Sequence, residues 1–160
     1  MTTKAVIGEF LDQKILAIVG MSRSEKKFSS MLYKNLKVKG YRLFAVNPNT
    51  ANNHGEACFD SILSLPEKVD GVVIVTPPNQ TEKVVREAIS AGIKYIWIQQ
   101  GAESQEAIDF CEKKGINVIH NQCVLMFAEP SGFPHKLHQF TNSGKGRFAF
   151  ICIVPEEGDK

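Results

Sequence analysis

The chain has 160 residues, the length of one domain, with 43% hydrophobic and 22% charged residues in the balance typical of globular proteins. Its net charge of +2 is too small to predict a nucleic-acid or anionic-membrane partner, and no apolar run is long enough to span a bilayer. The first residues lack the apolar core of a secretory signal, so we expect a cytoplasmic protein.

The apolar spacing of residues 5–11 predicts a short amphipathic helix. Residues 15–19 are all apolar, which predicts a buried parallel strand. A glycine, a short basic loop and a serine-rich helix start follow that strand. Four more apolar segments predict strands, at residues 41–46, 71–75, 94–98 and 117–119. The segments between them have helical spacing, except residues 50–65, which indicate a loop and a short helical turn. Asn79 or Thr81 is expected to cap the helix after residues 71–75, and Ser104 the helix after residues 94–98.

Alternating strands and helices are typical of βαβ units. They predict a single α/β domain with a doubly wound, open parallel sheet of about five strands in the order 3-2-1-4-5. A ligand then binds at the carboxyl ends of the strands, where the order reverses. We expect residues 1–123 to form this domain and residues 124–160 to be an extension packed on it. Residues 147–154 of the extension are a candidate sixth strand or oligomer contact, and the polar residues 155–160 are expected to fray.

The turn after the first strand does not fit a dinucleotide site. That site needs the pattern G-x-G-x-x-G, and here Gly20 is followed by Ser22 and Glu25 at the second and third positions. It also needs an acidic residue after the second strand, where this chain has Asn47. Two separate requirements fail, so a nicotinamide cofactor is disfavoured.

The same turn combines hydroxyls and cations with the free N–H groups of a helix start, a combination that suits phosphate oxygens. The residues concerned are Ser22, Arg23, Lys26, Lys27 and Ser29. The simpler alternative is that both lysines are solvated and that Ser29 only caps the helix. Three further strand ends carry polar or proline turns, which favours a binding site: Asn47–Pro48, Thr76–Pro77–Pro78 and Gln99–Gln100–Gly101.

Taken together, these segments resemble the CoA-binding domain family of small, stand-alone Rossmann proteins, which is similar to the N-terminal domain of the succinyl-CoA synthetase α subunit. The resemblance covers about residues 11–123. It rests on Gly20-Met21-Ser22, Lys27, Ser29, Leu36, Gly40-Tyr41, Val46-Asn47-Pro48, Val69-Asp70, Val75-Thr76-Pro77-Pro78, Ala91-Gly92-Ile93 and Trp97-Ile98-Gln99-Gln100-Gly101.

The resemblance implies a Rossmann-like fold with bound coenzyme A or an acyl-CoA. It places the phosphates against Gly20, Ser22, Lys27 and Ser29. It places Asn47 and Pro48 beside the adenosine, Thr76, Pro77 and Pro78 along the middle of the ligand, and Gln100 and Gly101 nearer the pantetheine. The family usually has arginine and proline where this chain has Lys27 and Phe28; lysine keeps the charge but loses the bidentate geometry.

No sequence pattern specifies a reaction, since a Ser-His-Asp order, a nucleophile elbow and a pair of carboxylates at strand ends are all missing. Cys123 follows the fifth predicted strand and is a candidate redox thiol that could form a mixed disulfide with CoA; the alternative is a small buried apolar residue. His120, His135 and His138 lack the paired cysteines of zinc motifs, so no metal site is predicted.

These observations favour a non-enzymatic binding or regulatory protein whose partner is a small nucleotide ligand. A protein partner or a homo-oligomer is compatible with the sequence. Two alternatives stay open: an NAD(P)-dependent oxidoreductase, and an interaction module whose nucleotide site is vestigial.

Overall fold

The computed structural model of the chain describes residues 2–49, 52–53 and 55–128. The chain divides into two units, Met1–Glu129 and Pro130–Lys160, and all the described residues belong to the first. The candidate strand at 147–154, the polar end at 155–160 and most of the expected extension therefore lie outside the described residues. Among the described residues, no helix has both the length and the apolar character that crossing a membrane requires.

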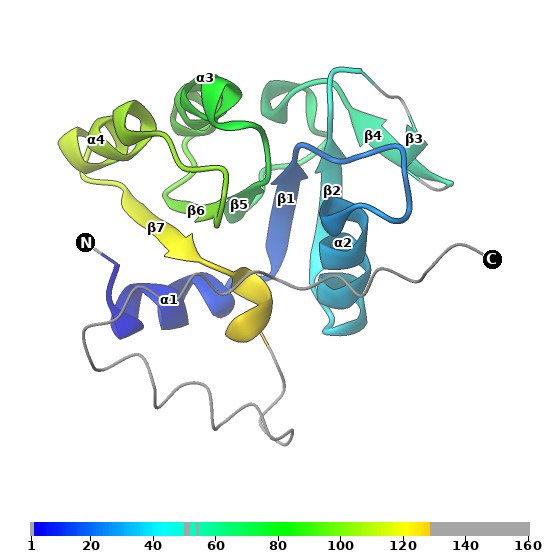
Figure 1. The fold of residues 1–160 in the computed structure, drawn as a ribbon, viewed down its shortest axis with the longest axis horizontal. Helices are drawn as coiled ribbons and strands as arrows, with labels where there is room; N and C mark the ends of the chain where they lie inside the picture. The colour runs from blue at the N-terminus through cyan, green and yellow to red at the C-terminus, as the bar shows by residue number, and fades with distance from the viewer. Residues whose placement is uncertain (1, 50–51, 54, 129–160) are drawn as a thin grey trace. The chain divides into compact units, whose positions relative to one another are not determined.

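The first unit is a seven-stranded sheet with helices on both faces (Figure 1). The strands are β1 Ile15–Val19, β2 Arg42–Val46, β3 Asn52–Asn53, β4 Glu56–Phe59, β5 Gly71–Ile74, β6 Tyr95–Gln99 and β7 Asn117–Gln122. The helices are α1 Lys4–Leu11, α2 Phe28–Val38, α3 Pro78–Ser90 and α4 Gln105–Lys113, with 3-10 turns η1 Ile62–Ser64 and η2 Val124–Met126. The strand order is β3-β4-β2-β1-β5-β6-β7, and only the β3–β4 pair is antiparallel.

The predicted Rossmann-like, doubly wound sheet is confirmed. The six parallel strands lie in the order β4-β2-β1-β5-β6-β7. Numbered along the chain, this is 3-2-1-4-5-6, which is the predicted order with a sixth strand added at the β7 edge. The sequence interpretation missed β4, where only Cys58 is fully buried, because no apolar run marks it. The strand expected third, at residues 71–75, is β5 Gly71–Ile74, which is therefore the fourth parallel strand and pairs with β1.

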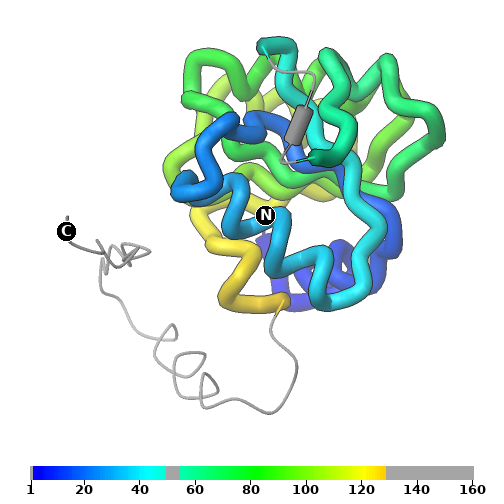
Figure 2. The backbone as a smooth tube through the Cα atoms, turned by 90° about the vertical axis from the view of Figure 1, so that its right-hand side faces the viewer, coloured from blue at the N-terminus to red at the C-terminus, as the bar shows by residue number. Residues whose placement is uncertain are grey.

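The two faces of the sheet are both buried, which explains the continuous apolar strands. In β1, Ala17 and Val19 pack into the cluster under α3 and α4, whereas Leu16 and Ile18 pack into the cluster formed with α1, α2 and η2. Figure 2 shows the same separation from the side, with α1 (blue) and η2 (yellow) below the sheet and α3 (green) above it. The helices on the two faces therefore pack against β1, β5 and β6 from opposite sides.

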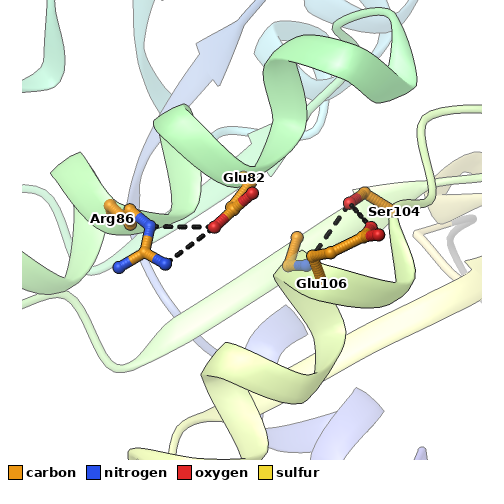
Figure 3. A network of polar contacts seen from close by, with 5 residues as sticks. Glu82, Arg86, Ser104 and Glu106 are labelled. Atoms are coloured by element: carbon orange, nitrogen blue, oxygen red, sulfur yellow. Dashed lines mark hydrogen bonds and ion pairs between the residues drawn. The ribbon is translucent and has the colours of Figure 1, made fainter.

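The starts of α3 and α4 are built differently. The predicted Ser104 cap of α4 is confirmed: its Oγ accepts from the N–H of Ala107 at 3.3 Å and also contacts Glu106 (Figure 3). The predicted cap of α3 by Asn79 or Thr81 is wrong, because α3 begins at Pro78 and has no side-chain cap. Glu82 and Arg86 form an i,i+4 ion pair of 2.7 Å on the outer surface of α3, as Figure 3 shows.

The alkaline stability of the fold is expected to depend on Cys111, a fully buried residue of α4. Burial, with a smaller contribution from Glu112, raises the pKa of its thiol from 9.0 to about 12. Between these values the unfolded chain has lost the proton and the folded chain keeps it, so stability falls as the pH rises above 9. From pH 9 to pH 11, wild type should lose about 2–3 kcal/mol more unfolding free energy than Cys111→Ala.

Urea unfolding of both proteins at the two pH values measures this difference. Burial also raises the pKa of Tyr33, Tyr41 and Cys58, but these groups are present in both proteins and their effects cancel. Equal losses in the two proteins would contradict the assignment to Cys111.

Candidate functional site

A cavity of about 500 Å³ lies at the carboxyl ends of β1, β5 and β6, beside the start of α2. The connections reverse direction between β1 and β5, which is where ligands bind in open α/β sheets. The cavity is lined by Gly20, Ser22, Lys27, Phe28, Ser29, Val75, Thr76, Pro77, Gln99, Gln100, Gly101 and Ala102.

Gly20 brings the end of β1 against the chain after β5. Its φ is +103°, in the region that favours glycine, and its N–H donates to the Val46 carbonyl at 3.0 Å. A Cβ at this position would lie 2.9 Å from the Thr76 nitrogen and from the Val75 carbonyl carbon. The glycine is therefore needed for both the backbone conformation and the close approach of the two strand ends.

Serine contacts hold the loop after Gly20. The Ser22 N–H donates to Ser29 Oγ at 3.0 Å, and the Ser24 N–H donates to Ser22 Oγ at 3.1 Å. The buried Ser30 donates its hydroxyl to the Ser24 carbonyl at 2.9 Å. These bonds join the loop to the first turn of α2.

Ser29 is not the cap of α2, as the simpler interpretation had it. The N-cap is Lys27, whose side chain makes no capping bond. Ser29 Oγ instead accepts from the loop, and its own hydrogen has no partner among the described residues. The hydroxyl can thus be donated into the cavity that Ser29 lines, next to the N–H groups at the start of the helix.

Lys27 is the only ionisable side chain among the described residues that line the cavity. It stands at the N-terminus of α2, where the helix dipole adds partial positive charge. The electrostatics of this end of the cavity therefore favour an anionic group.

Five predicted site residues do not line the cavity: Arg23, Lys26, Asn47, Pro48 and Pro78. Arg23 donates from Nη2 to the Asn49 carbonyl at 2.7 Å, and the Asn47 amide donates to the Met21 carbonyl and accepts from the Asn49 N–H. Arg23 and Asn47 thus tie the loop after β1 to the loop after β2. Pro78 is the first residue of α3.

The other eight predicted residues all line the cavity: Gly20, Ser22, Lys27, Ser29, Thr76, Pro77, Gln100 and Gly101. The predicted site residues left out four lining residues, namely Phe28, Val75, Gln99 and Ala102, although Gln99 was named as part of a strand-end turn. Each is next in sequence to a predicted one. Gln99 also carried a signal of its own, since a polar residue that ends a fully apolar strand needs a buried partner or a ligand.

Cys123 is only 2% exposed and belongs to the core beside η2; it is not among the residues that line the cavity. A mixed disulfide would require its Sγ to become accessible. Of the three histidines considered for a metal, only His120 lies within the described residues. In that part of the chain no three His, Cys, Asp or Glu side chains come together as metal ligands.

A doubly wound parallel sheet, with a cation and a helix start at its switch point, defines a Rossmann-like protein with a candidate anion site. A family model described as CoA binding domain matches residues 14–129, and the chain belongs to this family.

Relatives with this domain are of two kinds. ADP-forming acetate–CoA ligase I of Archaeoglobus fulgidus is 29% identical over 148 residues, which are 86% of this chain but only 22% of the ligase. The uncharacterized protein YneT of Bacillus subtilis is 29% identical over 123 residues, 76% of this chain and 91% of that protein. A solved conserved hypothetical protein of Pyrococcus furiosus is 37% identical, with a TM-score of 0.67, covering 71% of this chain and 98% of its own. The domain is thus similar both to part of a long ligase and to nearly whole small proteins.

Proposed function

We propose that the chain binds coenzyme A or an acyl-CoA in the cavity at the ends of β1, β5 and β6, as a non-catalytic binding or regulatory protein. The observation that carries the proposal is the cavity itself: a single cation, an uncapped helix start and a donating serine lie at the switch point of a CoA-binding-domain fold. These groups complement a phosphate.

The proposed placement follows the lining residues. The phosphates lie against Gly20, Ser22, Lys27 and Ser29. Thr76 and Pro77 line the middle of the ligand, and Gln100 and Gly101 lie nearer the pantetheine. Asn47 and Pro48 stand beyond the cavity lining, on the side proposed for the adenosine.

The lining supports recognition better than catalysis. Lys27 is the one ionisable group among the described lining residues, so those residues offer no pair of groups for acid–base chemistry and no activated nucleophile. In this proposal a partner protein, a second copy of the chain or a redox event responds to whether the ligand is bound in the cavity. We also propose a cytoplasmic location, where the cysteine thiols stay reduced.

The oxidoreductase alternative has less support. A nicotinamide dinucleotide needs a carboxylate for the ribose after the second strand, and Asn47 at that position is already engaged with the Met21 carbonyl. Calorimetric titration with CoA, dephospho-CoA and NADP separates the alternatives. Binding of CoA supports the proposal, binding of NADP alone overturns it, and binding of no nucleotide favours the vestigial interaction module.

Replacing Lys27 by alanine is expected to weaken CoA binding about tenfold, because a charge-assisted contact to phosphate is lost. Lys26→Ala is the matched control: it removes the same charge one residue earlier, at a position outside the cavity lining. It should change the affinity less than twofold.

The loss from Lys27→Ala should shrink as salt is added, because Lys27 is exposed and its field is screened. Titrations of the three proteins at two ionic strengths measure both effects. Equal losses in the two variants would indicate only a diffuse positive field and would contradict a contact from Lys27.

A further inference from the structure

A buried pair of threonines lies at the edge of the cavity, and one of them, Thr76, lines it. Thr76, 7% exposed, lines the cavity after β5, and Thr81 is fully buried in α3. Their hydroxyl oxygens are 3.0 Å apart. Thr81 Oγ1 also lies 2.7 Å from the Ala102 carbonyl oxygen, in the turn after β6.

The positions of the two hydroxyl hydrogens follow from these contacts. The Ala102 carbonyl can only accept, so at 2.7 Å the hydrogen of Thr81 must point to it. Thr81 Oγ1 then receives the hydrogen of Thr76. With its one hydrogen used, Thr76 Oγ1 offers the cavity only lone pairs, and a ligand atom that touches it must be a donor.

Gln99 offers the cavity a hydrogen-bond donor, whereas Thr76 offers an acceptor. It is 3% exposed, and its Oε1 accepts from the Val124 N–H at 3.1 Å, which fixes the orientation of the amide. Among the described residues Nε2 has no hydrogen-bond partner, although Gln99 lines the cavity. The side chain therefore offers N–H groups to a ligand carbonyl.

We propose that Thr76 and Gln99 recognise the amide groups of the ligand: an amide N–H donates to Thr76 Oγ1, and an amide carbonyl accepts from Gln99 Nε2. This inference rests on the proposed function and makes it more specific. A phosphate or carbonyl oxygen could pair with Thr76 only if Thr76 gave up its bond to Thr81, so the nucleotide half of CoA is placed at the Lys27 end. The pantetheine arm, with its two secondary amides, belongs over β5 and β6.

The test uses Thr76→Val in the full chain, because valine keeps the shape of threonine and leaves the bond from Thr81 to Ala102 in place. Calorimetry with CoA and with adenosine 3′,5′-bisphosphate, which lacks the arm, should show about a tenfold loss for CoA. The affinity for the bisphosphate should change less than twofold. Thr76→Ser, which keeps the hydroxyl, should bind both ligands like wild type.

A change in the ligand provides a second measurement that does not depend on the variant. Two CoA analogues are used, and each carries an ester oxygen in place of a different one of the two pantetheine amide N–H groups. One of them should bind wild type about tenfold more weakly than CoA, and Thr76→Val should bind that analogue and CoA equally. The two losses are then not additive, as expected when both changes remove one hydrogen bond.

The outcomes separate the two proposals. Suppose that wild type binds CoA. The amide assignment is overturned, and CoA binding stands, if Thr76→Val weakens CoA and the bisphosphate equally or weakens neither. The same holds if the losses of affinity from Thr76→Val and from the ester analogue add. If wild type does not bind CoA, both are overturned.

Discussion

Gly20→Ala is expected to reduce the free energy of unfolding by about 3–5 kcal/mol and to abolish binding in the cavity. The φ of +103° disfavours any side chain, and the new Cβ would lie 2.9 Å from the backbone of Val75 and Thr76. Backbone atoms cannot turn aside as a flexible side chain can, so the ends of β1 and β5 must separate.

Gly40→Ala is the matched control for this change. Gly40 also has a positive φ, +93°, but a Cβ there would have no atom within 4 Å. Gly40→Ala should reduce the free energy of unfolding by about 1–2 kcal/mol, because only the cost of a positive φ applies, and it should leave binding intact. Urea unfolding gives both values, and similar losses in the two variants would show that the contact with Val75 and Thr76 is unimportant.

Trp97→Ala is expected to destabilise the protein by about 3–5 kcal/mol. The ring is fully buried on β6, its Nε1 donates to the Gln122 carbonyl at 3.1 Å, and it meets the ring of Phe10 edge-on at 5.2 Å between centroids. Removing it leaves a cavity between α1 and the sheet, and the Gln122 carbonyl keeps only its bond from the Gln100 N–H at 3.3 Å.

The control for Trp97→Ala is Val38→Ala, at a side chain that is 88% exposed, where the change should stay within about 0.5 kcal/mol. Because Trp97 is the sole tryptophan, unfolding is followed by circular dichroism. A loss below about 1 kcal/mol would mean that the core closes around the missing ring.

The parallel sheet was predictable because strands buried on both faces, such as Ile15–Val19, are continuous apolar runs. The strand Glu56–Phe59 was not, since its position at the border of the parallel sheet leaves only Cys58 fully buried. Its existence depends on pairing with β2, a tertiary contact that local composition does not reveal.

In the candidate site, too, some residues could be predicted from local sequence and others depend on tertiary contacts. The residues that come directly after apolar strands, such as Gly20 and Thr76, line the cavity as their positions suggest. The roles of Arg23 and Asn47 could not be predicted, because each depends on a hydrogen bond to another loop. Likewise, Thr81 was a candidate helix cap, but α3 begins at Pro78, so Thr81 lies inside the helix and donates its hydroxyl to the Ala102 carbonyl.

The serine contacts between Ser22, Ser24, Ser29 and Ser30 have a kinetic consequence. They join the loop after β1 to the first turn of α2 before any ligand arrives, so the proposed binding requires little ordering of this loop and loses little conformational entropy there. For the proposed ligand, we therefore expect the rate of capture to be governed by diffusion and by the attraction of Lys27 for an anion, and the rate of release to report how well the rest of the ligand fits.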